Sequence, residues 1–164
     1  MLTAKDLMSS RLMTVSPHMG LRDLVDFLRE NGIHAAPVTV PAEDKEKIVG
    51  LVSMTDVISY LSDEEGEVEH NFSRLFTLDP DEESYQAFAA RLDEATVHDL
   101  MTPQVFTCEV DATAGEVASL MTEKGIHRVV VTQDGTAVGL LSATDLLRAV
   151  SHYERALAAR AAAD

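Results

Sequence analysis

The chain has 164 residues and a mass of 17.8 kDa, a length that suits one domain or two very small ones. Acidic residues outnumber basic ones 28 to 13, and the formal net charge of −15 repels nucleic-acid phosphates and anionic lipids. We therefore expect no nucleic-acid partner and no membrane partner. A single cysteine, Cys108, permits no internal disulfide, and no apolar run is long enough to cross a bilayer. These features predict a cytoplasmic protein.

An internal repeat organises the sequence. The tripeptide Asp-Leu-Met at residues 6–8 recurs at 99–101, and Gly-Ile-His at 32–34 recurs at 125–127, both at an offset of 93. After a loop that is four residues longer in the first copy, residues 49–56 match 138–145 at an offset of 89. One register kept over so many identities indicates a duplication.

The first copy predicts the element order β-α-β-β-α. A short apolar strand is expected over 12–15, and a helix follows over 21–28, where apolar residues recur at helical spacing before a cap at Gly32. A hairpin with a long polar tip over 41–47 comes next, and a helix over 55–61 closes the unit.

The second copy repeats this order. Thr113 and Glu116 have the spacing of a capping box at the start of its helix, and Gly125 is placed to end that helix. Asp134-Gly135 predicts a tight hairpin turn. The expected strands and closing helix cover 105–108, 128–132, 137–141 and residues from 144 onward.

Two segments lie outside the repeats. Residues 62–95 form an acidic linker in which Pro80 and the acids beside it predict a helix start, and Tyr85, Phe88, Ala89 and Leu92 give that helix an apolar stripe. The alanine-rich tail is expected to extend the last helix. The predicted organisation is a first repeat at 1–61, the linker at 62–95, a second repeat at 96–150 and a helical tail at 151–164.

This pattern resembles the cystathionine-β-synthase (CBS) domain family, in which two tandem repeats form a Bateman module. The most specific matches are residues 50–56 and 139–145, with the two Gly-Ile-His motifs. The resemblance implies an α+β fold in which tandem β-α-β-β-α repeats pack sheet to sheet about a pseudo-twofold axis. It also implies a homodimer and a stand-alone regulatory module, not an enzyme, that binds an adenosine ligand in clefts between the repeats.

The residue chemistry and the resemblance together give candidate ligand contacts. Adenine needs an apolar slot and a few main-chain partners. Candidate walls are Pro37, Val38, Val130 and Val131, and candidate main-chain partners are Thr14, Val15, Thr107 and Cys108. Asp56 and Asp145 stand where the family has its ribose-binding aspartate. Phosphate favours a helix N-terminus, and candidate donors there are Ser53, Thr55, Ser142 and Thr144. The resemblance implies further phosphate contacts at His127 and Arg128, and at His34 in the equivalent place of the first copy.

The two copies depart from the family pattern in different places. His127-Arg128 matches the family's His-Arg stretch, whereas the first copy has His34-Ala35; the second copy has Val130 where the family commonly has proline. Each candidate also has a structural explanation. Ser53, Thr55 and Asp56 are residues that helix capping predicts, and His34, His127 and Arg128 are compatible with packing or plain surface positions.

The leading hypothesis is a sensor whose effector is AMP, ADP, ATP or S-adenosylmethionine, with no required cofactor, no metal and an unknown protein target as a further partner. The net charge favours AMP or another lightly charged adenosine species over ATP. The alternative is a ligand-indifferent interaction scaffold. No motif of a catalytic serine, a phosphate-binding loop or a zinc protease is present, so an enzyme ranks third.

Overall fold

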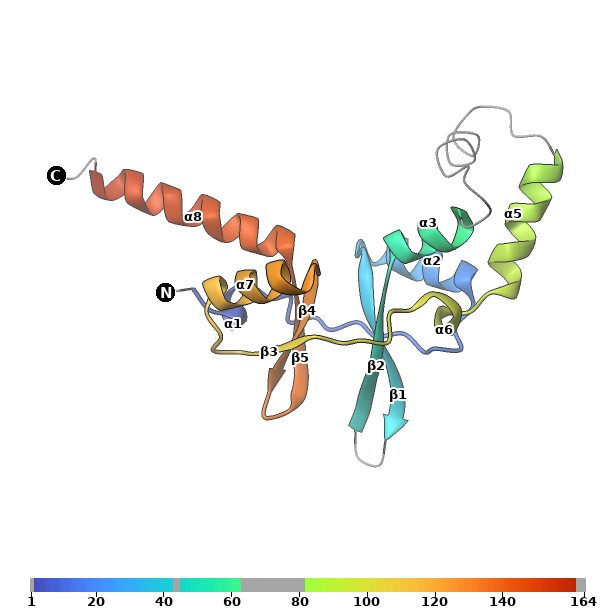
Figure 1. Cartoon of the computed structure of the whole chain (residues 1–164), viewed down its shortest axis with the longest axis horizontal. Helices are drawn as coiled ribbons and strands as arrows, with labels where there is room; N and C mark the ends of the chain where they lie inside the picture. Colours follow the sequence, from blue (N-terminus) through green and yellow to red (C-terminus); the bar gives the residue numbers. More distant parts are fainter. Residues whose placement is uncertain (1, 43–44, 63–81, 162–164) are drawn as a thin grey trace. The chain divides into compact units, whose positions relative to one another are not determined.

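The computed structural model describes residues 2–42, 45–62 and 82–161 (Figure 1). The chain divides into two compact units, which we describe separately: unit 1 comprises Met1–Leu12 and Val105–Asp164, and unit 2 comprises Met13–Gln104. Each unit combines its own sheet with helices, so the expected mixture of α and β structure with two sheets is confirmed.

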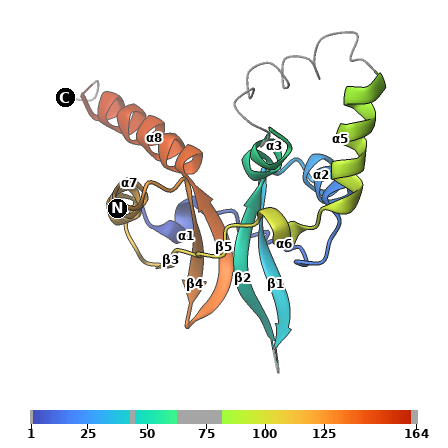
Figure 2. The same cartoon turned by 45° about the vertical axis from the view of Figure 1, so that its right-hand side comes forward.

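Unit 2 is built on an antiparallel hairpin of strands β1 (Ala35–Ala42) and β2 (Lys45–Ser53). Helices α2 (Leu21–Glu30) and α3 (Met54–Ser62) pack against it, and the predicted helical stripe is buried as expected (Figure 2). The core includes Leu21, Leu24, Leu28, Ala36, Val38, Val52 and Val57.

Two expectations for the first copy are corrected. The predicted strand over 12–15 is reduced to a single parallel bridge between Val15 and Val38. The predicted hairpin tip over 41–47 is mostly strand, because β1 and β2 remain paired out to Ala42 and Lys45. Both strands are exposed at that end, so their residues can be polar and still pair. Residues 43–44 lie outside the described residues.

Helix α5 (Glu82–Glu94) covers α2 and α3 within unit 2 (Figure 2). Arg22 pairs with Asp93 at 2.7 Å, and Arg91 donates hydrogen bonds to the carbonyl oxygens of Tyr60 and Leu61 at the end of α3. The predicted linker helix is therefore confirmed from Glu82 onward, while its expected start at Pro80 lies outside the described residues.

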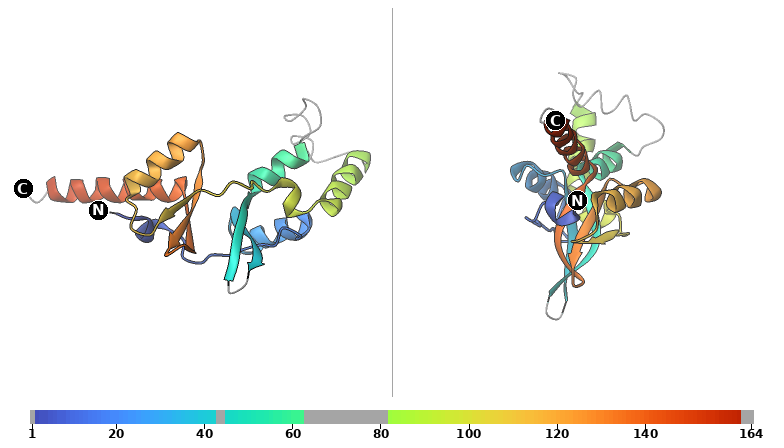
Figure 3. Two further views of the ribbon diagram at one scale, coloured as in Figure 1. Left: turned by 60° about the horizontal axis from the view of Figure 1, so that its bottom comes forward. Right: turned by 90° about the vertical axis from the view of Figure 1, so that its left-hand side faces the viewer.

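Unit 1 contains strands β3 (Thr107–Glu109), β4 (Arg128–Gln133) and β5 (Thr136–Ser142), with β3 parallel and β5 antiparallel to β4. Its helices are α1 (Ala4–Leu7), α7 (Ala114–Lys124) and α8 (Ala143–Ala161). Figure 3 shows α8 continuing beyond α7 toward the C-terminus, as the alanine-rich tail predicted.

The local signals of the second copy are confirmed. Thr113 and Glu116 form the capping box of α7, and Gly125 ends the helix with φ of 62°. Asp134 and Gly135 have φ of 52° and 72°, the left-handed pair that a tight hairpin turn requires. The predicted strand over 105–108 is shifted, because β3 begins at Thr107 and ends at Glu109.

The opening segments of the two repeats are exchanged between the units. Residues 1–12, which open the first repeat, belong to unit 1, where Ser9 bridges Leu140 of β5. Helix α6 (Val97–Leu100), which opens the second repeat, belongs to unit 2, where Thr102 bridges Leu51 of β2. The compact units therefore differ from the sequence repeats at their first residues.

The Asp of each Asp-Leu-Met motif stabilises its own short helix. The main-chain N–H and the hydroxyl of Thr96 both donate to Asp99, and these bonds hold the pKa of Asp99 below its ordinary 3.8. Thr3 lowers the pKa of Asp6 in the same way.

Acidification should therefore weaken both opening helices. Because each carboxyl has a lower pKa in the folded chain, its stabilising contribution is present above about pH 4 and is lost as pH falls through the lowered pKa. Thr96→Val removes the hydroxyl donor and leaves the stronger main-chain donor, so the pKa of Asp99 should rise but stay below 3.8 in a carboxyl-carbon NMR titration. Asp6 is the internal control, and an equal shift of both groups would contradict this account.

Candidate functional site

The strand-to-helix junction of unit 2 forms a tightly bonded corner from Ser53 to Asp56. The Oδ2 atom of Asp56 accepts hydrogen bonds from the main-chain N–H of Ser53 at 2.7 Å and from its hydroxyl at 2.6 Å. The N–H of Asp56 donates to Ser53 Oγ at 3.4 Å. His34 also holds the corner, because its carbonyl oxygen accepts from Met54 N–H at 3.0 Å.

Unit 1 repeats this corner from Ser142 to Asp145. Asp145 Oδ2 accepts from the N–H and hydroxyl of Ser142 at 2.9 and 2.5 Å, and Asp145 N–H donates to Ser142 Oγ at 3.3 Å. The carbonyl oxygen of His127 accepts from Ala143 N–H at 2.9 Å. We call both arrangements the capped corners.

Capping uses only one oxygen of each carboxylate. In both corners the serine hydroxyl donates to Oδ2 of the aspartate. This bond is the structural role that helix capping predicts for the aspartate. Asp56 Oδ1 has no hydrogen-bond partner among the described residues, whereas Asp145 Oδ1 accepts from Arg148 at 2.9 Å. The cap therefore fixes Oδ2 of each carboxylate, while Oδ1 stays open to other donors at Asp56 and is shared with Arg148 at Asp145.

Arg148 is a neighbour of the site that our sequence reasoning missed. It lies three residues after Asp145 on α8, a spacing at which helical side chains meet. Ser59 occupies the equivalent position of the first copy. Together with His127 and Arg128, Arg148 makes the corner of unit 1 richer in cationic or titratable groups than that of unit 2.

The two copies differ in how the main-chain groups predicted to contact adenine are used within the fold. Val15 donates its N–H to Pro37 and accepts from Thr39 N–H, so both of its main-chain groups are used by β1. In the first copy the expectation of adenine contacts therefore depends on Thr14, whose hydroxyl donates to Glu46. In the second copy, Thr107 and Cys108 pair with Val130 and Val131 along the parallel strands.

The predicted apolar walls are buried strand residues. Val38 and Val131 belong to the core clusters of their own units. Pro37 and Val130, which alternate with them, lie on the opposite faces of the strands and are also buried. Cys108 is half-buried. Burial is the main cause that raises the pKa of its thiol, and the negative charge of Glu109 adds to it, so the thiol is neutral at physiological pH.

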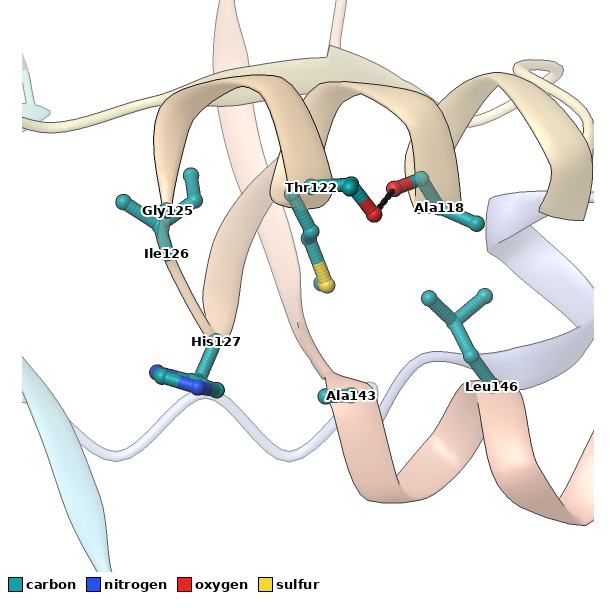
Figure 4. Close-up of a pocket in the computed structure, with 8 residues that line it drawn as sticks. Ala118, Thr122, Gly125, Ile126, His127, Ala143 and Leu146 are labelled. Atoms are coloured by element: carbon teal, nitrogen blue, oxygen red, sulfur yellow. Dashed lines mark hydrogen bonds between the residues drawn. The ribbon is translucent and has the colours of Figure 1, made fainter.

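The histidine side chains are exposed, unlike these buried walls. His127 is exposed and lines a depression of about 310 Å³ between α7 and the start of α8, together with Ala118, Thr122, Ala143 and Leu146 (Figure 4). His34, Thr55 and Thr144 are exposed, whereas Arg128 is partly buried on β4. These residues remain predicted ligand contacts.

The CBS-domain family model matches residues 4–63 and 97–152. The chain belongs to the CBS-domain family. Its two matched regions confirm the tandem pair that the repeated motifs predicted.

Curated relatives of this CBS pair include proteins of different sizes. The chain is 26% identical over 149 residues to the A-adding tRNA nucleotidyltransferase of Aquifex aeolicus, covering 91% of this chain and 14% of that protein. It is 29% identical over 143 residues to an uncharacterized 33.4 kDa protein of Thermofilum pendens, covering 87% and 42%. Hypoxic response protein 1 of Mycobacterium tuberculosis is 23% identical over 150 residues, covering 90% and 85%. The CBS pair thus spans less than half of the first two relatives.

Solved CBS structures share the fold. The CBS domain of a membrane protein from Sphaerobacter thermophilus has a TM-score of 0.65 and 26% identity, covering 90% of this chain and 86% of that one. CBSX2 in complex with AMP has a TM-score of 0.65 and 24% identity, covering 93% and 98%. The CBS pair of protein MJ0100 in complex with 5′-methylthioadenosine and S-adenosyl-L-methionine has a TM-score of 0.63 and 20% identity, covering 93% and 98%.

Two absences concern the described part of the CBS pair only. Its His, Cys, Asp and Glu side chains form no group of three or more that could hold a metal ion. No helix in this part is both long and apolar enough to cross a membrane.

Proposed function

We propose that this CBS pair is a regulatory module that binds an adenine nucleotide or another adenosine ligand at its capped corners, and that binding alters the geometry of a homodimer. The observation that carries the proposal is the recurrence of one carboxylate geometry, with Oδ2 fixed by a serine, at Asp56 and at Asp145. The fold shared with CBSX2, solved with AMP, and with MJ0100, solved with two adenosine ligands, supports the same class of ligand.

Ribose fits the outward oxygen Oδ1 of each corner, which is open at Asp56 and has one further lone pair beside the Arg148 bond at Asp145. The two adjacent hydroxyls of ribose are donors, and an ionised carboxylate oxygen is a strong acceptor. Because Ser53 and Ser142 already immobilise Oδ2, little side-chain entropy remains to be lost when Oδ1 accepts these bonds. The cap thereby preorganises the carboxylate for the ligand.

A phosphate favours the corner of unit 1. The N-terminus of α8 supplies main-chain donors and a positive dipole end, and Arg128 and Arg148 add positive charge. In unit 2 the equivalent positions are Ala35 and Ser59, so this corner suits an uncharged or lightly charged adenosine ligand. We expect AMP to bind unit 1 more tightly than adenosine does.

Regulation follows from unequal affinity of two dimer geometries for the ligand. A ligand present at ten times its dissociation constant for one geometry, with no affinity for the other, shifts the equilibrium by about 1.4 kcal/mol. Such a shift changes the ratio of the two geometries about tenfold, which is sufficient for a regulatory response.

Calorimetric titration of the full chain with AMP, ADP, ATP and S-adenosylmethionine tests ligand binding. Asp145→Asn keeps an oxygen that can accept from Ser142 but replaces the outward acceptor by an amide donor, so AMP affinity should fall about 10- to 100-fold. Asp56→Asn makes the same change in unit 2. Asp99→Asn is the matched control, because Asp99 caps a helix through Thr96 and lies outside both corners.

The same titration decides between the sensor and the scaffold. A chain that binds none of these ligands at millimolar concentration is not a sensor, and neither is one whose binding is unchanged by both corner variants. The scaffold draws support from the capping bonds, which account for Ser53 and Ser142 without any ligand.

A further inference from the structure

The two capped corners differ at the outward oxygen of the aspartate. In unit 1, Nη1 of Arg148, three residues further along α8, donates to Asp145 Oδ1 at 2.9 Å. In unit 2 the equivalent residue of α3 is Ser59, and Asp56 Oδ1 accepts no hydrogen bond from the described residues. The same carboxylate oxygen is therefore open in one copy and already in use in the other.

The arginine is the movable member of the pair. The side chain of Arg148 is 76% exposed, whereas that of Asp145 is 17% exposed and accepts two hydrogen bonds from Ser142. Among the described residues, the guanidinium has no acceptor other than Asp145. Exposed ion pairs of this kind stabilise a protein weakly, because water solvates both charges. A ligand can therefore displace the guanidinium without disturbing the capped carboxylate.

Ribose needs the acceptor position that Arg148 uses. A carboxylate oxygen has two lone pairs, and ribose brings two adjacent hydroxyl donors. While Arg148 is bound, Asp145 Oδ1 has one lone pair left, so only one of the two hydroxyls can donate to it. At Asp56 Oδ1 both hydroxyls can donate. The second ribose bond in unit 1 therefore requires the guanidinium to leave.

The charge of the ligand decides what the displaced arginine gains. A neutral nucleoside offers the guanidinium no anionic partner in exchange for Asp145, so Arg148 returns to water. A 5′-phosphate is anionic and has several acceptor oxygens, and a guanidinium binds such a group through charge-assisted hydrogen bonds. A nucleotide thus replaces the ion pair that its ribose breaks, whereas a nucleoside does not.

We infer that Arg148 makes the corner of unit 1 selective for the charge of its ligand, by occupying Asp145 Oδ1 in the free chain and moving to the phosphate when a nucleotide binds. This inference rests on the proposed function and names the residue that sets its ligand class. The corner of unit 2, with Ser59 at this position, discriminates less between nucleotides and neutral nucleosides.

Isothermal titration of the full chain with AMP and with adenosine tests this role. An Asp56→Asn background removes the outward acceptor of unit 2, so that the titration reports on unit 1. In this background Arg148→Ser should bind adenosine about two- to fivefold more tightly, because no ion pair has to break. It should bind AMP less tightly, because the phosphate loses its guanidinium partner, and the AMP-to-adenosine affinity ratio should fall about tenfold.

Two further variants isolate the effect of the arginine. Ser59→Arg, made in an Asp145→Asn chain, should transfer the selectivity to unit 2 and raise its AMP-to-adenosine affinity ratio about tenfold. Arg29→Ser in the Asp56→Asn chain is the matched control, because Arg29 and Asp26 form an exposed pair of the same spacing, at 2.8 Å, in the other unit. This control should leave both affinities for unit 1 unchanged.

The outcomes distinguish the selectivity role from the proposed function. If neither AMP nor adenosine binds any of these chains at millimolar concentration, the ligand site itself is absent and both are overturned. If both ligands bind but Arg148→Ser keeps the affinity ratio of its parent, only the selectivity role is overturned. Circular dichroism checks that each variant is folded. A folding defect lowers both affinities together, whereas the expected changes for AMP and adenosine have opposite signs.

Discussion

Replacing Gly139 by alanine should destabilise unit 1 by about 1–3 kcal/mol, the range observed when a tightly packed site is overfilled. A Cβ at this position would lie 2.8 Å from the carbonyl oxygen of Ser9 and 2.5 Å from the sulfur of Met8. The side chain of Met8 can move, but the Ser9 carbonyl is fixed by the paired hydrogen bonds of Ser9 and Leu140. The methyl group therefore forces the exchanged segment away from β5.

Thermal and urea unfolding of Gly139→Ala measures this cost. Gly115→Ala is the matched control, because nothing stands nearer than 4.0 Å to its added Cβ and alanine is favoured over glycine within a helix by about 0.5–1 kcal/mol. Gly139→Ala should lower the stability and Gly115→Ala should raise it. Equal stability of Gly139→Ala and the parent chain would mean that the exchanged segment packs less closely than described.

The glycine and the Asp-Leu-Met motif form one structural unit in each half of the chain. Gly50 meets Thr102 and Met101 as Gly139 meets Ser9 and Met8, with a built Cβ 2.9 Å from the Thr102 carbonyl oxygen. The repeated methionine thus packs on the repeated glycine of the other copy. The sequence shows both motifs as parts of a repeat, but nothing in it indicates that the methionine of one copy packs on the glycine of the other.

Signals confined to a few neighbouring residues were predictable from the sequence. The helical stripe of α2, the capping box at Thr113, the cap at Gly125 and the Asp134-Gly135 turn are all decided by local geometry. Because the two copies are related by a constant offset, the element order predicted for one copy also predicts that of the other. Local chemistry therefore predicted most of the helices and hairpins.

Features that depend on distant residues were not predictable in this way. Val15 bonds to β1 through main-chain groups that every residue has, so no sequence signal distinguishes a strand from a single bridge there. The extension of the first hairpin to Ala42 and Lys45 likewise depends on pairing between exposed strands. Arg148 has no counterpart in the first copy, where Ser59 occupies its position, so the repeat does not mark it as a site residue.

The capped corners show how one residue type serves structure and the proposed function together. Sequence reasoning treated capping and ligand contact by Asp56 as alternatives. The geometry assigns capping to Oδ2 and leaves Oδ1 for another donor, so the first role does not exclude the second. A substitution to alanine would remove both roles, which is why asparagine is the sharper test of ligand binding.

The compact unit, and not the sequence repeat, should be the piece that folds alone. Residues 13–104 contain all of unit 2, including α6, whereas residues 1–62 contain the first repeat without it. We expect the fragment 13–104 to unfold cooperatively on heating and the fragment 1–62 to lack a cooperative transition. Circular dichroism melts and amide NMR spectra of both fragments measure this difference.

The missing α6 segment explains the expected failure of the shorter fragment. Val97 is fully buried in the core of unit 2, and burial of one such side chain is worth about 1.5–3 kcal/mol. The segment also supplies the paired hydrogen bonds of Thr102 with Leu51 and the bond from Val97 N–H to Met19. These losses together are a large share of the roughly 5–15 kcal/mol that stabilises a domain. Val97→Asp in the fragment 13–104 should abolish its transition, and cooperative unfolding of residues 1–62 would show that the exchanged segment is dispensable.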